Sequence, residues 1–308
     1  MATTHEATAA SRRSVPKPIR SSDGTSASAE PEPETAPATG QARYDPRDFW
    51  EARLRRTFNL EGVGFRVLGL GFNNALYQQR DVVFRRVIRR HRLDPEGKDI
   101  VELGPGTGFY VRLWRRARVA SLVGLDITAV ACEKLSALYP DFRFVQSDIT
   151  EAWPVNDDSA DIVTAFDVLF HIVDDARFDA SLTEAGRVLR PGGVLLVSDL
   201  FAHGAPFAGF HQVSRTLERY QASLDAAGFD IVGRHAVFVT MHPPLGIAPS
   251  RRRDIGLAAW ARLEHHLVGR PNHGRAIGRI LRWIDRILTA RLRDGPSTEI
   301  LVARRRSS

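Results

Sequence analysis

The sequence predicts an α/β fold in which an open, mostly parallel sheet carries helices on both faces. Short segments rich in valine, isoleucine and leucine alternate with helical segments through the middle of the 308-residue chain. One of them, Asp99–Leu103, runs directly into a glycine-rich turn and then a helix. Strands that helices cover on both faces are short and apolar in this way. Repeated strand–helix units with right-handed crossovers build parallel sheets.

The predicted elements follow one another from residue 96 onward. The expected strands are 99–103, 121–125, 142–145, 161–166, 194–198, 229–240 and 297–303. The expected helices between them are 109–118, 128–139, 176–190 and 214–227. Pro191-Gly192-Gly193 should form a turn before the fifth strand. Gly228 should end the preceding helix in the left-handed conformation that glycine readily adopts.

Three further regions flank or interrupt this series. Residues 1–40 contain almost no large apolar side chain, so we expect a disordered tail. Residues 41–95 predict an N-terminal helical cap, because apolar residues recur there at helical spacing. The main domain, 96–308, includes a helical insertion at 241–295 before the last strand, far longer than an ordinary loop.

Composition and cysteine usage indicate a globular protein of a reducing compartment. Hydrophobic residues make up 43% of the chain and charged residues 26%, which excludes a largely disordered or fibrous protein. The single cysteine, Cys132, allows no disulfide within the chain. No apolar run approaches the roughly 18 residues that a membrane span needs, and no secretory signal is recognised. We therefore expect a cytoplasmic location.

The net charge of +7 is concentrated near the C-terminus. From residue 250 onward, 14 arginines stand against 5 acidic residues, so the rest of the chain is close to neutral. No pattern of aromatic and basic residues suited to base stacking accompanies this charge, and we expect no nucleic-acid partner.

The turn Glu102-Leu103-Gly104-Pro105-Gly106-Thr107-Gly108 is the strongest functional signal. Ligands of open parallel sheets bind beyond the carboxyl ends of the strands, and glycines let the backbone approach them. A dinucleotide-binding turn has the pattern G-x-G-x-x-G, whereas these glycines are spaced by two and Phe109 replaces the third glycine of that pattern. Glu102 suits a cationic amino-acid group and not a pyrophosphate. A nicotinamide-dependent oxidoreductase is therefore disfavoured.

Acids also follow the next three strands. Asp126 comes 24 residues after Glu102, Asp148 follows 22 residues later, and Asp167 another 19. Because the carboxyl ends of parallel strands meet at one edge of the sheet, the four carboxylates should face one site. Asp126 is placed to accept hydrogen bonds from ribose hydroxyls. For Asp148 the alternative is a cap on a helix or turn.

These motifs resemble those of class I S-adenosylmethionine-dependent methyltransferases. The resemblance covers residues 95–240 and rests on the glycine-rich turn with Val101 before it, Leu125-Asp126, Ser147-Asp148-Ile149, Phe166-Asp167-Val168-Leu169-Phe170-His171 and Leu189-Arg190-Pro191-Gly192-Gly193. It implies a Rossmann-like, seven-stranded sheet whose last strand is antiparallel. It also implies S-adenosyl-L-methionine as the cofactor.

The resemblance also implies roles for the motif residues. The methionine part of the cofactor would be held by Glu102, Gly104, Pro105, Gly106, Thr107 and Gly108. Asp126 would hold the ribose, and Asp148 with Ile149 the adenine. Ile127, Ser147 and Phe166 are expected to complete the cofactor site, and Asp167 would lie near the sulfonium.

Methyl transfer is an in-line displacement at carbon, so the protein mainly aligns the reacting atoms and excludes water. A hydroxyl acceptor also needs a base, and His171 is our first candidate, with Asp167 as a second catalytic residue. A packing or capping role is the alternative for His171. The expected substrate contacts are Tyr77, Arg80, His211, Gln212 and Arg215.

Histidines at other strand ends do not predict a metal site. His203 and His211 follow the fifth strand and His242 follows the sixth. The spacing of eight residues between His203 and His211 fits no short metal-ligand motif, so no metal is expected.

The insertion predicts an amphipathic, arginine-rich helix over 275–292. Its apolar stripe is Ile277, Ile280, Leu281, Ile284, Ile287 and Leu288. The sixth strand should be parallel, which would put the insertion on the cofactor side, in position to roof the substrate pocket. Docking on the core is one interpretation of this helix. The other is contact with a membrane surface, near a lipid-linked acceptor.

The sequence thus predicts an S-adenosylmethionine-dependent methyltransferase acting on a small-molecule acceptor. A hydroxyl of a sugar, a glycolipid or a secondary metabolite is the favoured acceptor. The alternatives are N- or C-methyl transfer to a metabolite, and a non-catalytic protein that binds the cofactor. The expected location is the cytoplasm, or its boundary with a membrane. The oligomeric state does not follow from the sequence.

Overall fold

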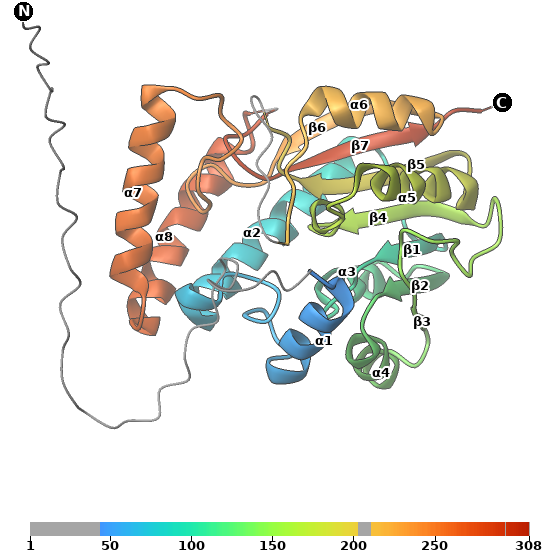
Figure 1. The fold of residues 1–308 in the computed structure, drawn as a ribbon, viewed down its shortest axis with the longest axis horizontal. Helices are drawn as coiled ribbons and strands as arrows, with labels where there is room; N and C mark the ends of the chain where they lie inside the picture. Colours follow the sequence, from blue (N-terminus) through green and yellow to red (C-terminus); the bar gives the residue numbers. More distant parts are fainter. Residues whose placement is uncertain (1–43, 203–210, 293, 308) are drawn as a thin grey trace, which may run out of the picture. The chain divides into compact units, whose positions relative to one another are not determined.

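A seven-stranded sheet forms the centre of the computed structural model, which describes residues 44–202, 211–292 and 294–307 (Figure 1). The strands lie in the order β3-β2-β1-β4-β5-β7-β6. Their bounds are β1 (Asp99–Leu103), β2 (Ser121–Asp126), β3 (Arg143–Gln146), β4 (Ala160–Phe166), β5 (Leu189–Asp199), β6 (Phe229–Ala236) and β7 (Glu299–Arg305). The predicted tail, residues 1–40, lies outside the described residues.

Strand directions confirm the predicted fold class. β1 pairs in parallel with β2 and β4, β2 with β3, and β4 with β5. β7 is antiparallel to both of its neighbours, β5 and β6. β6 therefore runs in the same direction as the parallel strands, as predicted. The order reverses between β1 and β4, and their carboxyl ends flank the point at which such sheets bind ligands.

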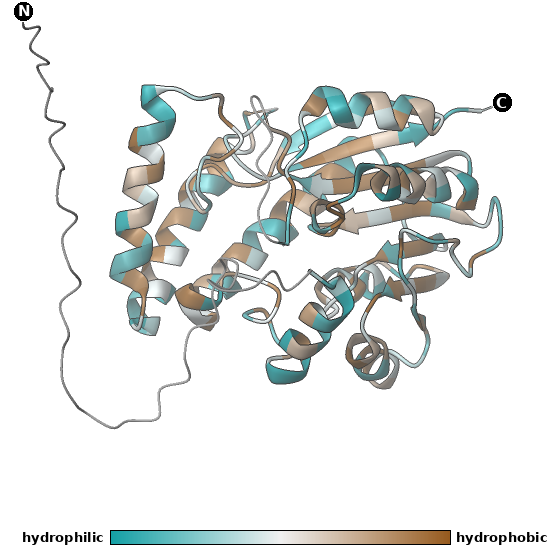
Figure 2. Ribbon diagram, viewed as in Figure 1, coloured by the Kyte–Doolittle hydropathy of each residue, from teal (hydrophilic) through white to brown (hydrophobic). Residues whose placement is uncertain are grey.

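Helices cover both faces of the sheet. Their bounds are α1 (Pro46–Arg56), α2 (Gly69–Arg90), α3 (Phe109–Arg116), α4 (Ala129–Leu138), α5 (Asp175–Val188), α6 (Leu217–Ala226), α7 (Arg251–Leu267) and α8 (Pro271–Leu288), with 3-10 turns η1 (Arg66–Leu68) and η2 (Leu169–His171). Apolar residues of α2 and α3 share one core cluster with one face of the sheet, and those of α5 and α6 share a second cluster with the other. The strands are largely brown in Figure 2, as expected between two helical layers.

Two local predictions were wrong. Pro191-Gly192-Gly193 is not a turn before β5 but part of that strand, where residues 190–193 bulge opposite Asp161 between the pairs Ala160↔Leu189 and Ile162↔Val194. The sixth strand ends at Ala236 and not at 240. Its continuation leaves the sheet because the buried carboxylate of Asp285 accepts hydrogen bonds from the backbone N–H groups of Val239, Thr240 and Met241.

The insertion forms two helices where the sequence predicted one. α7 was missed, and α8 begins at Pro271 and ends at Leu288. Gly274 and Gly278 of α8 allow a close approach to α2, because a Cβ at Gly278 would lie 3.1 Å from the Cβ of Ala75. Ile277 and Leu281 pack against the core cluster there. This face of α8 therefore packs on the core, which is the first of the two interpretations given for the helix. Among the described residues, no helix is long and apolar enough to cross a membrane.

Candidate active site

A cavity of about 620 Å³ opens beyond the carboxyl ends of β1, β2 and β4. The predicted residues that line it are Tyr77, Glu102, Gly104, Pro105, Gly106, Thr107, Asp126, Ile127, Ser147, Asp148, Ile149, Phe166, Asp167 and His171. Gly108, Arg80, His211, Gln212 and Arg215 are not part of its wall. The structure therefore brings most of the predicted site together around one cavity of the size that small ligands occupy.

The glycine-rich turn depends on backbone conformations that side chains oppose. Gly104, Gly106 and Gly108 have positive φ angles, of 57°, 52° and 79°. A Cβ on Gly104 would lie 2.7 Å from a methyl group of Val168, and one on Gly108 2.6 Å from a methyl group of Leu135. Gly108 is the N-cap of α3. Its absence from the cavity wall suggests that it shapes the turn and does not touch a ligand.

Glu102 carries a buried carboxylate with an unused oxygen. Its side chain is 2% exposed, and its Oε2 has no hydrogen-bond partner among the residues that the structure describes. Burial, together with nearby Asp126, raises the pKa of Glu102 to about 8. An orphaned carboxylate at the wall of a cavity is costly unless a ligand satisfies it. Its charge and position fit the ammonium group of an amino-acid moiety.

Asp126 and Asp148 are partly engaged by their own loops. Asp126 accepts hydrogen bonds from the backbone of Gly106 (3.0 Å) and from the hydroxyl of Thr128 (2.7 Å). Asp148 accepts from the Thr150 hydroxyl (2.7 Å) and from Arg177 (2.8 Å). Asp148 therefore does cap a turn, the alternative left open from the sequence, while it also lines the cavity. Each carboxylate has further lone pairs for a ligand hydroxyl or amino group.

Asp167, which is partly exposed, forms an ion pair with the buried Arg80. The two charged atoms, Oδ2 of Asp167 and NH1 of Arg80, lie 2.5 Å apart, and Ser198 donates a hydrogen bond of 3.0 Å to Oδ1. Burial raises the pKa of Asp167, and Arg80 opposes that rise. Asp167 also has a φ of 57°, a conformation that non-glycine residues seldom adopt. The ion pair and the hydrogen bond from Ser198 hold this carboxylate in one position at the cavity wall.

His171 also lines the cavity, and its neighbours fix the orientation of its ring. Its Nδ1 lies 2.8 Å from the backbone carbonyl of His211, which can only accept a hydrogen bond, so Nδ1 carries the proton and Nε2 is a free acceptor. Trp50 packs edge-on against the ring at 4.8 Å. Burial lowers the pKa of His171 to about 3, so the ring stays neutral at ordinary pH.

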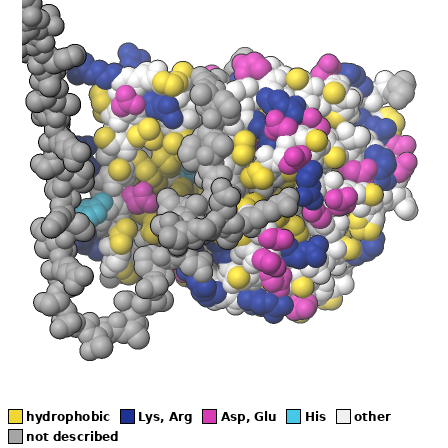
Figure 3. Space-filling view, viewed as in Figure 1, with side chains coloured by type: hydrophobic (Ala, Val, Ile, Leu, Met, Phe, Trp, Pro, Cys, Tyr) yellow, Lys and Arg dark blue, Asp and Glu magenta, His cyan; other side chains and the backbone are white. Residues whose placement is uncertain are grey.

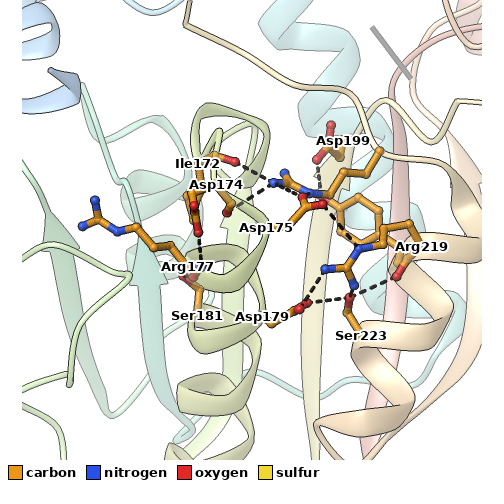
Figure 4. Close-up of polar contacts among 11 residues, drawn as sticks. Ile172, Asp174, Asp175, Arg177, Asp179, Ser181, Asp199, Arg219 and Ser223 are labelled. Carbon is orange, nitrogen blue, oxygen red and sulfur yellow. Dashed lines mark hydrogen bonds and ion pairs between the residues drawn. The ribbon is translucent and has the colours of Figure 1, made fainter. Parts of the chain in front are cut away.

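A short segment, residues 211–215, holds the wall that carries His171. Val213 donates a backbone hydrogen bond to Phe170, His171 donates to His211, and Arg215 donates to the carbonyl of Ile172 (2.8 Å). Arg215 is 3% exposed and also pairs with Asp175. Beside it, Asp179 of α5 faces Arg219 and Ser223 of α6 (Figure 4). We call residues 211–215 the wall clamp.

Comparison with known proteins now gives the kind of domain. Residues 101–197 match a family described as a methyltransferase domain. A probable S-adenosylmethionine-dependent methyltransferase of Mycolicibacterium smegmatis is 33% identical over 177 residues, which cover 55% of this chain and 65% of that protein. Residues 101–197 are therefore a methyltransferase domain, similar in sequence to S-adenosylmethionine-dependent enzymes. The cofactor that these relatives are named for is S-adenosylmethionine.

Two further relatives of this methyltransferase extend the comparison. A probable S-adenosylmethionine-dependent methyltransferase of Mycobacterium tuberculosis is 32% identical over 176 residues, covering 55% of this chain and 61% of that protein. A fatty-acid O-methyltransferase of Mycolicibacterium smegmatis is 36% identical over 110 residues, covering 34% and 38%. The chain thus matches less than two thirds of the length of each relative.

The roof of the methyltransferase cavity was missed by sequence reasoning. It comes from α1 and the residues around it, where Tyr44, Trp50, Leu54 and Val63 line the cavity. Arg53 fixes the roof by donating to the carbonyls of Gly62 (2.7 Å) and Gly64 (3.0 Å). The available signal was the set Phe49, Trp50, Leu54 and Phe58, which recurs at helical spacing within the predicted cap.

Other expectations about this methyltransferase need correction or remain predictions. The insertion does not roof the cavity in the described part of the chain, because no residue of α7 or α8 lines it. Arg80 and Arg215, predicted as substrate contacts, lie behind the wall instead. Of the histidines considered as metal ligands, His203 lies outside the described residues. Within the described ranges, no group of three or more metal-ligating side chains is found.

Proposed function

We propose that this protein transfers the methyl group of S-adenosylmethionine to a hydroxyl of a small molecule whose body is largely apolar. The observation that carries the proposal is the orphaned Oε2 of Glu102, a buried carboxyl oxygen at the cavity wall with no partner from the described part of the chain. It supports binding of a ligand with a cationic amino-acid group, as S-adenosylmethionine has.

The residues around the cavity fit the parts of this cofactor. Glu102 and the glycine-rich turn would receive the methionine part, Asp126 the ribose hydroxyls, and Asp148 with the backbone near Ile149 the adenine. Phe166 and Asp167 line the floor between these groups and His171. When bound, the cofactor supplies an electrophilic methyl group on a positively charged sulfur. The remaining task of the chain is to align an acceptor with that methyl and to exclude water.

His171 is the group we propose to receive the acceptor proton. Its Nε2 is the free acceptor of a neutral ring that the wall clamp and Trp50 hold in one orientation. A hydroxyl hydrogen-bonded to Nε2 would attack the methyl carbon while the bond from that carbon to sulfur breaks, and would pass its proton to Nε2 once the carbon–oxygen bond has formed. The pKa of His171, lowered to about 3, keeps Nε2 unprotonated over the neutral range and makes it a weak base. Nε2 therefore takes the proton from the methylated, positively charged oxygen and not from the free hydroxyl.

The apolar wall supports an acceptor with an apolar body. Around His171, the cavity is lined by Trp50, Leu54, Val63, Phe170, Ile172 and Val173. A free sugar would leave most of its hydroxyls unsatisfied against such a surface, at a cost for each buried polar group. We therefore favour a secondary metabolite or the lipid-linked form of a sugar. One relative is named a fatty-acid O-methyltransferase, which is consistent with an apolar acceptor.

Two experiments test the proposal in order. Calorimetry with S-adenosylhomocysteine and, separately, with NAD should give saturable binding of the first only. The protein is then incubated with cofactor labelled in the methyl group and a cell extract, and the labelled product is identified. Label on an oxygen supports the proposal, and label on nitrogen or carbon would favour the alternative chemistry. Tight cofactor binding without any labelled product would favour a non-catalytic role.

The outer face of α8 is a second surface whose proposed partner is a membrane. Ile280 and Trp283 are 60% and 66% exposed, and Ile287 lies on the same face. Apolar side chains also gather over α7 and α8 in Figure 3. Arg279 and Arg286 are exposed beside this stripe. An apolar stripe with a tryptophan and flanking arginines matches the surface of an anionic bilayer.

Vesicle sedimentation tests this membrane contact. The protein should sediment with phosphatidylglycerol vesicles more than with phosphatidylcholine vesicles, and Trp283→Glu should release it. Leu138→Glu is the matched control, because Leu138 is an exposed leucine of α4 (57%) away from the stripe. Negligible binding of the unmodified protein would reject the proposal. A dimer that Trp283→Glu dissociates would assign the stripe to a second copy of the chain.

A further inference from the structure

A second cavity, of about 870 Å³, lies along the outer strand β6, between the C-terminal ends of α2 and α8. It shares no lining residue with the methyltransferase cavity. Basic and titratable side chains dominate its wall, and these are Arg86, Arg90, His91, Arg234, His235 and Arg291. Asp294 is the one acidic residue among its described lining residues. We call it the β6 cleft.

The positive charge of the β6 cleft is only partly balanced by carboxylates. Glu299 pairs with Arg234 through two hydrogen bonds of 2.9 and 3.0 Å. Arg86 donates to Thr289 and to the carbonyl of Arg286, which are neutral acceptors. Within the described part of the chain, Arg90 and Arg291 have no carboxylate partner. The guanidinium groups of Arg86, Arg90 and Arg291 thus line the cleft without an ion pair to a described carboxylate.

Three groups of the cleft have lowered pKa values, with burial as the first cause and positive neighbours as the second. Burial and the neighbouring Arg89 and Arg286 lower the pKa of Arg86. Burial, Arg90 and Arg304 lower the pKa of His91, and burial, His91 and two arginines lower the pKa of His235 to about 4. The part of each shift that comes from neighbouring positive charges is a cost that a bound anion would offset.

The backbone of β6 is modified to bring two histidines into the cleft. β6 changes register against β7 between Ile231 and Gly233, so the strand bulges there. Gly233 has no side chain where a Cβ would lie 2.5 Å from the ring of His91. The ring therefore rests on the strand, with its Nε2 2.7 Å from Nε2 of His235. Bulges in outer strands commonly redirect side chains toward a functional site.

We propose that the β6 cleft binds an anion that carries phosphate groups. Guanidinium groups match phosphate oxygens in pairs, and imidazole N–H groups add further donors. The arginines come from two places, Arg86 and Arg90 on α2 and Arg291 after α8, and this spread suits a ligand with more than one phosphate group, such as a pyrophosphate, or an organic phosphate. Arg90 lies in the last turn of α2, where a cation also stabilises the helix. That effect does not account for Arg291, for the bulge or for the paired histidines.

Calorimetry with pyrophosphate tests the proposal on the full chain, with sodium chloride of equal ionic strength in the reference cell. The unmodified protein should bind one pyrophosphate saturably. Arg90→Gln combined with Arg291→Gln should weaken binding at least about tenfold, because a hydrogen bond to a charged group contributes roughly 1.5–3 kcal/mol. The matched control is Arg116→Gln combined with Arg262→Gln. Arg116 also lies in the last turn of a helix, and both arginines are exposed outside the cleft.

A second experiment, with phosphatidylglycerol vesicles, distinguishes a lipid headgroup from a soluble phosphate as the ligand. Loss of both pyrophosphate and vesicle binding in the cleft variant would identify a lipid headgroup as a ligand. Loss of pyrophosphate binding alone would identify a soluble phosphate. Binding that does not saturate, or that falls equally in the control variant, would overturn the proposal. None of these measurements uses S-adenosylmethionine, so their failure leaves the proposed methyl transfer untouched.

Discussion

The two halves of the methyltransferase cavity are built from different parts of the chain. In the half proposed to hold the cofactor, Glu102, Asp126 and Asp148 each lie at or just beyond the end of a strand. In the half proposed to hold the acceptor, α1 supplies the roof and η2 carries His171, and residues 211–215 hold that wall from behind. One half depends on single strand ends, and the other depends on contacts between distant segments.

This difference teaches how each half is expected to respond to substitution. A strand end is fixed by the sheet, so a change of Glu102 removes a charge and leaves the surroundings in place. The position of His171 depends on hydrogen bonds from another segment, so changes well outside the cavity should alter turnover. The following predictions run from the largest expected effect to the smallest.

His171→Ala should lower kcat for a hydroxyl acceptor by roughly 10²- to 10⁴-fold, the range for loss of a general base. Binding of S-adenosylhomocysteine should stay within about threefold of the unmodified protein, because the proposed contacts to the cofactor lie in the other half. Steady-state kinetics and calorimetry measure the two quantities. Near-normal turnover would remove His171 from the proposed chemistry and favour N- or C-methyl transfer.

Glu102→Gln should weaken binding of S-adenosylhomocysteine by roughly 10- to 100-fold, because a neutral amide replaces the charged partner of the ammonium group. The volume of the side chain is retained, so the fold should persist. Asp157→Asn is the matched control, since Asp157 is an acid of the β3–β4 connection outside the cavity wall. Unchanged affinity in Glu102→Gln would show that the ammonium group binds elsewhere.

The affinity for S-adenosylhomocysteine should also rise with pH, by about tenfold from pH 6 to pH 7 and by about fivefold from pH 7 to pH 8. The sign follows from the raised pKa of Glu102, about 8, in the protein without ligand. Below that pH the carboxyl group is protonated, and binding of an ammonium group has to expel the proton. Above it, no proton is released and the affinity should level off. Calorimetry in buffers of different ionisation enthalpy counts the proton, and Glu102→Gln should abolish the dependence.

Arg215→Lys should reduce kcat by about three- to tenfold, equivalent to roughly 1 kcal/mol, while cofactor affinity stays constant. Lysine keeps the charge beside Asp175 but cannot donate to Asp175 and to the carbonyl of Ile172 with the same geometry. Arg187→Lys is the control, because Arg187 of α5 likewise donates to a carboxylate, Glu184, and to a backbone carbonyl, that of Val155, and lies outside the cavity wall. Equal losses in both variants would indicate general destabilisation.

Much of the sheet and the cofactor half was predictable because the signals are local. Apolar strands alternate with helices, and an acid follows each of the first four strands, so spacing along the chain determines which groups meet. The direction of β6 also followed from this alternation. The two element boundaries that were predicted wrongly have causes that the local pattern does not contain. Asp285, far along the chain, ends β6 early, and a bulge absorbs Pro191-Gly192-Gly193 into β5.

The acceptor half was less predictable because its contacts join segments far apart in sequence. Arg215 was assigned to the substrate, yet its guanidinium reaches the back of the wall, 43 residues away at Ile172. Arg80 was assigned in the same way and instead pairs with Asp167. A charged residue near a strand end can face the cavity or the layer behind it. Only the packing of α2 and of residues 211–215 decides between these two outcomes.

The antiparallel pairing of β6 and β7 has a consequence for how this protein can change over evolutionary time. The pairs run from Phe229↔Arg305 to Ala236↔Glu299, so the whole insertion is topologically the loop of a β-hairpin. Closing a longer loop costs little, about 0.6 kcal/mol for each doubling of its length. The insertion can therefore change in length at little cost in chain entropy while β6 and β7 stay in register, provided that Ile277, Leu281 and Asp285 keep their contacts with the core and with the chain after β6.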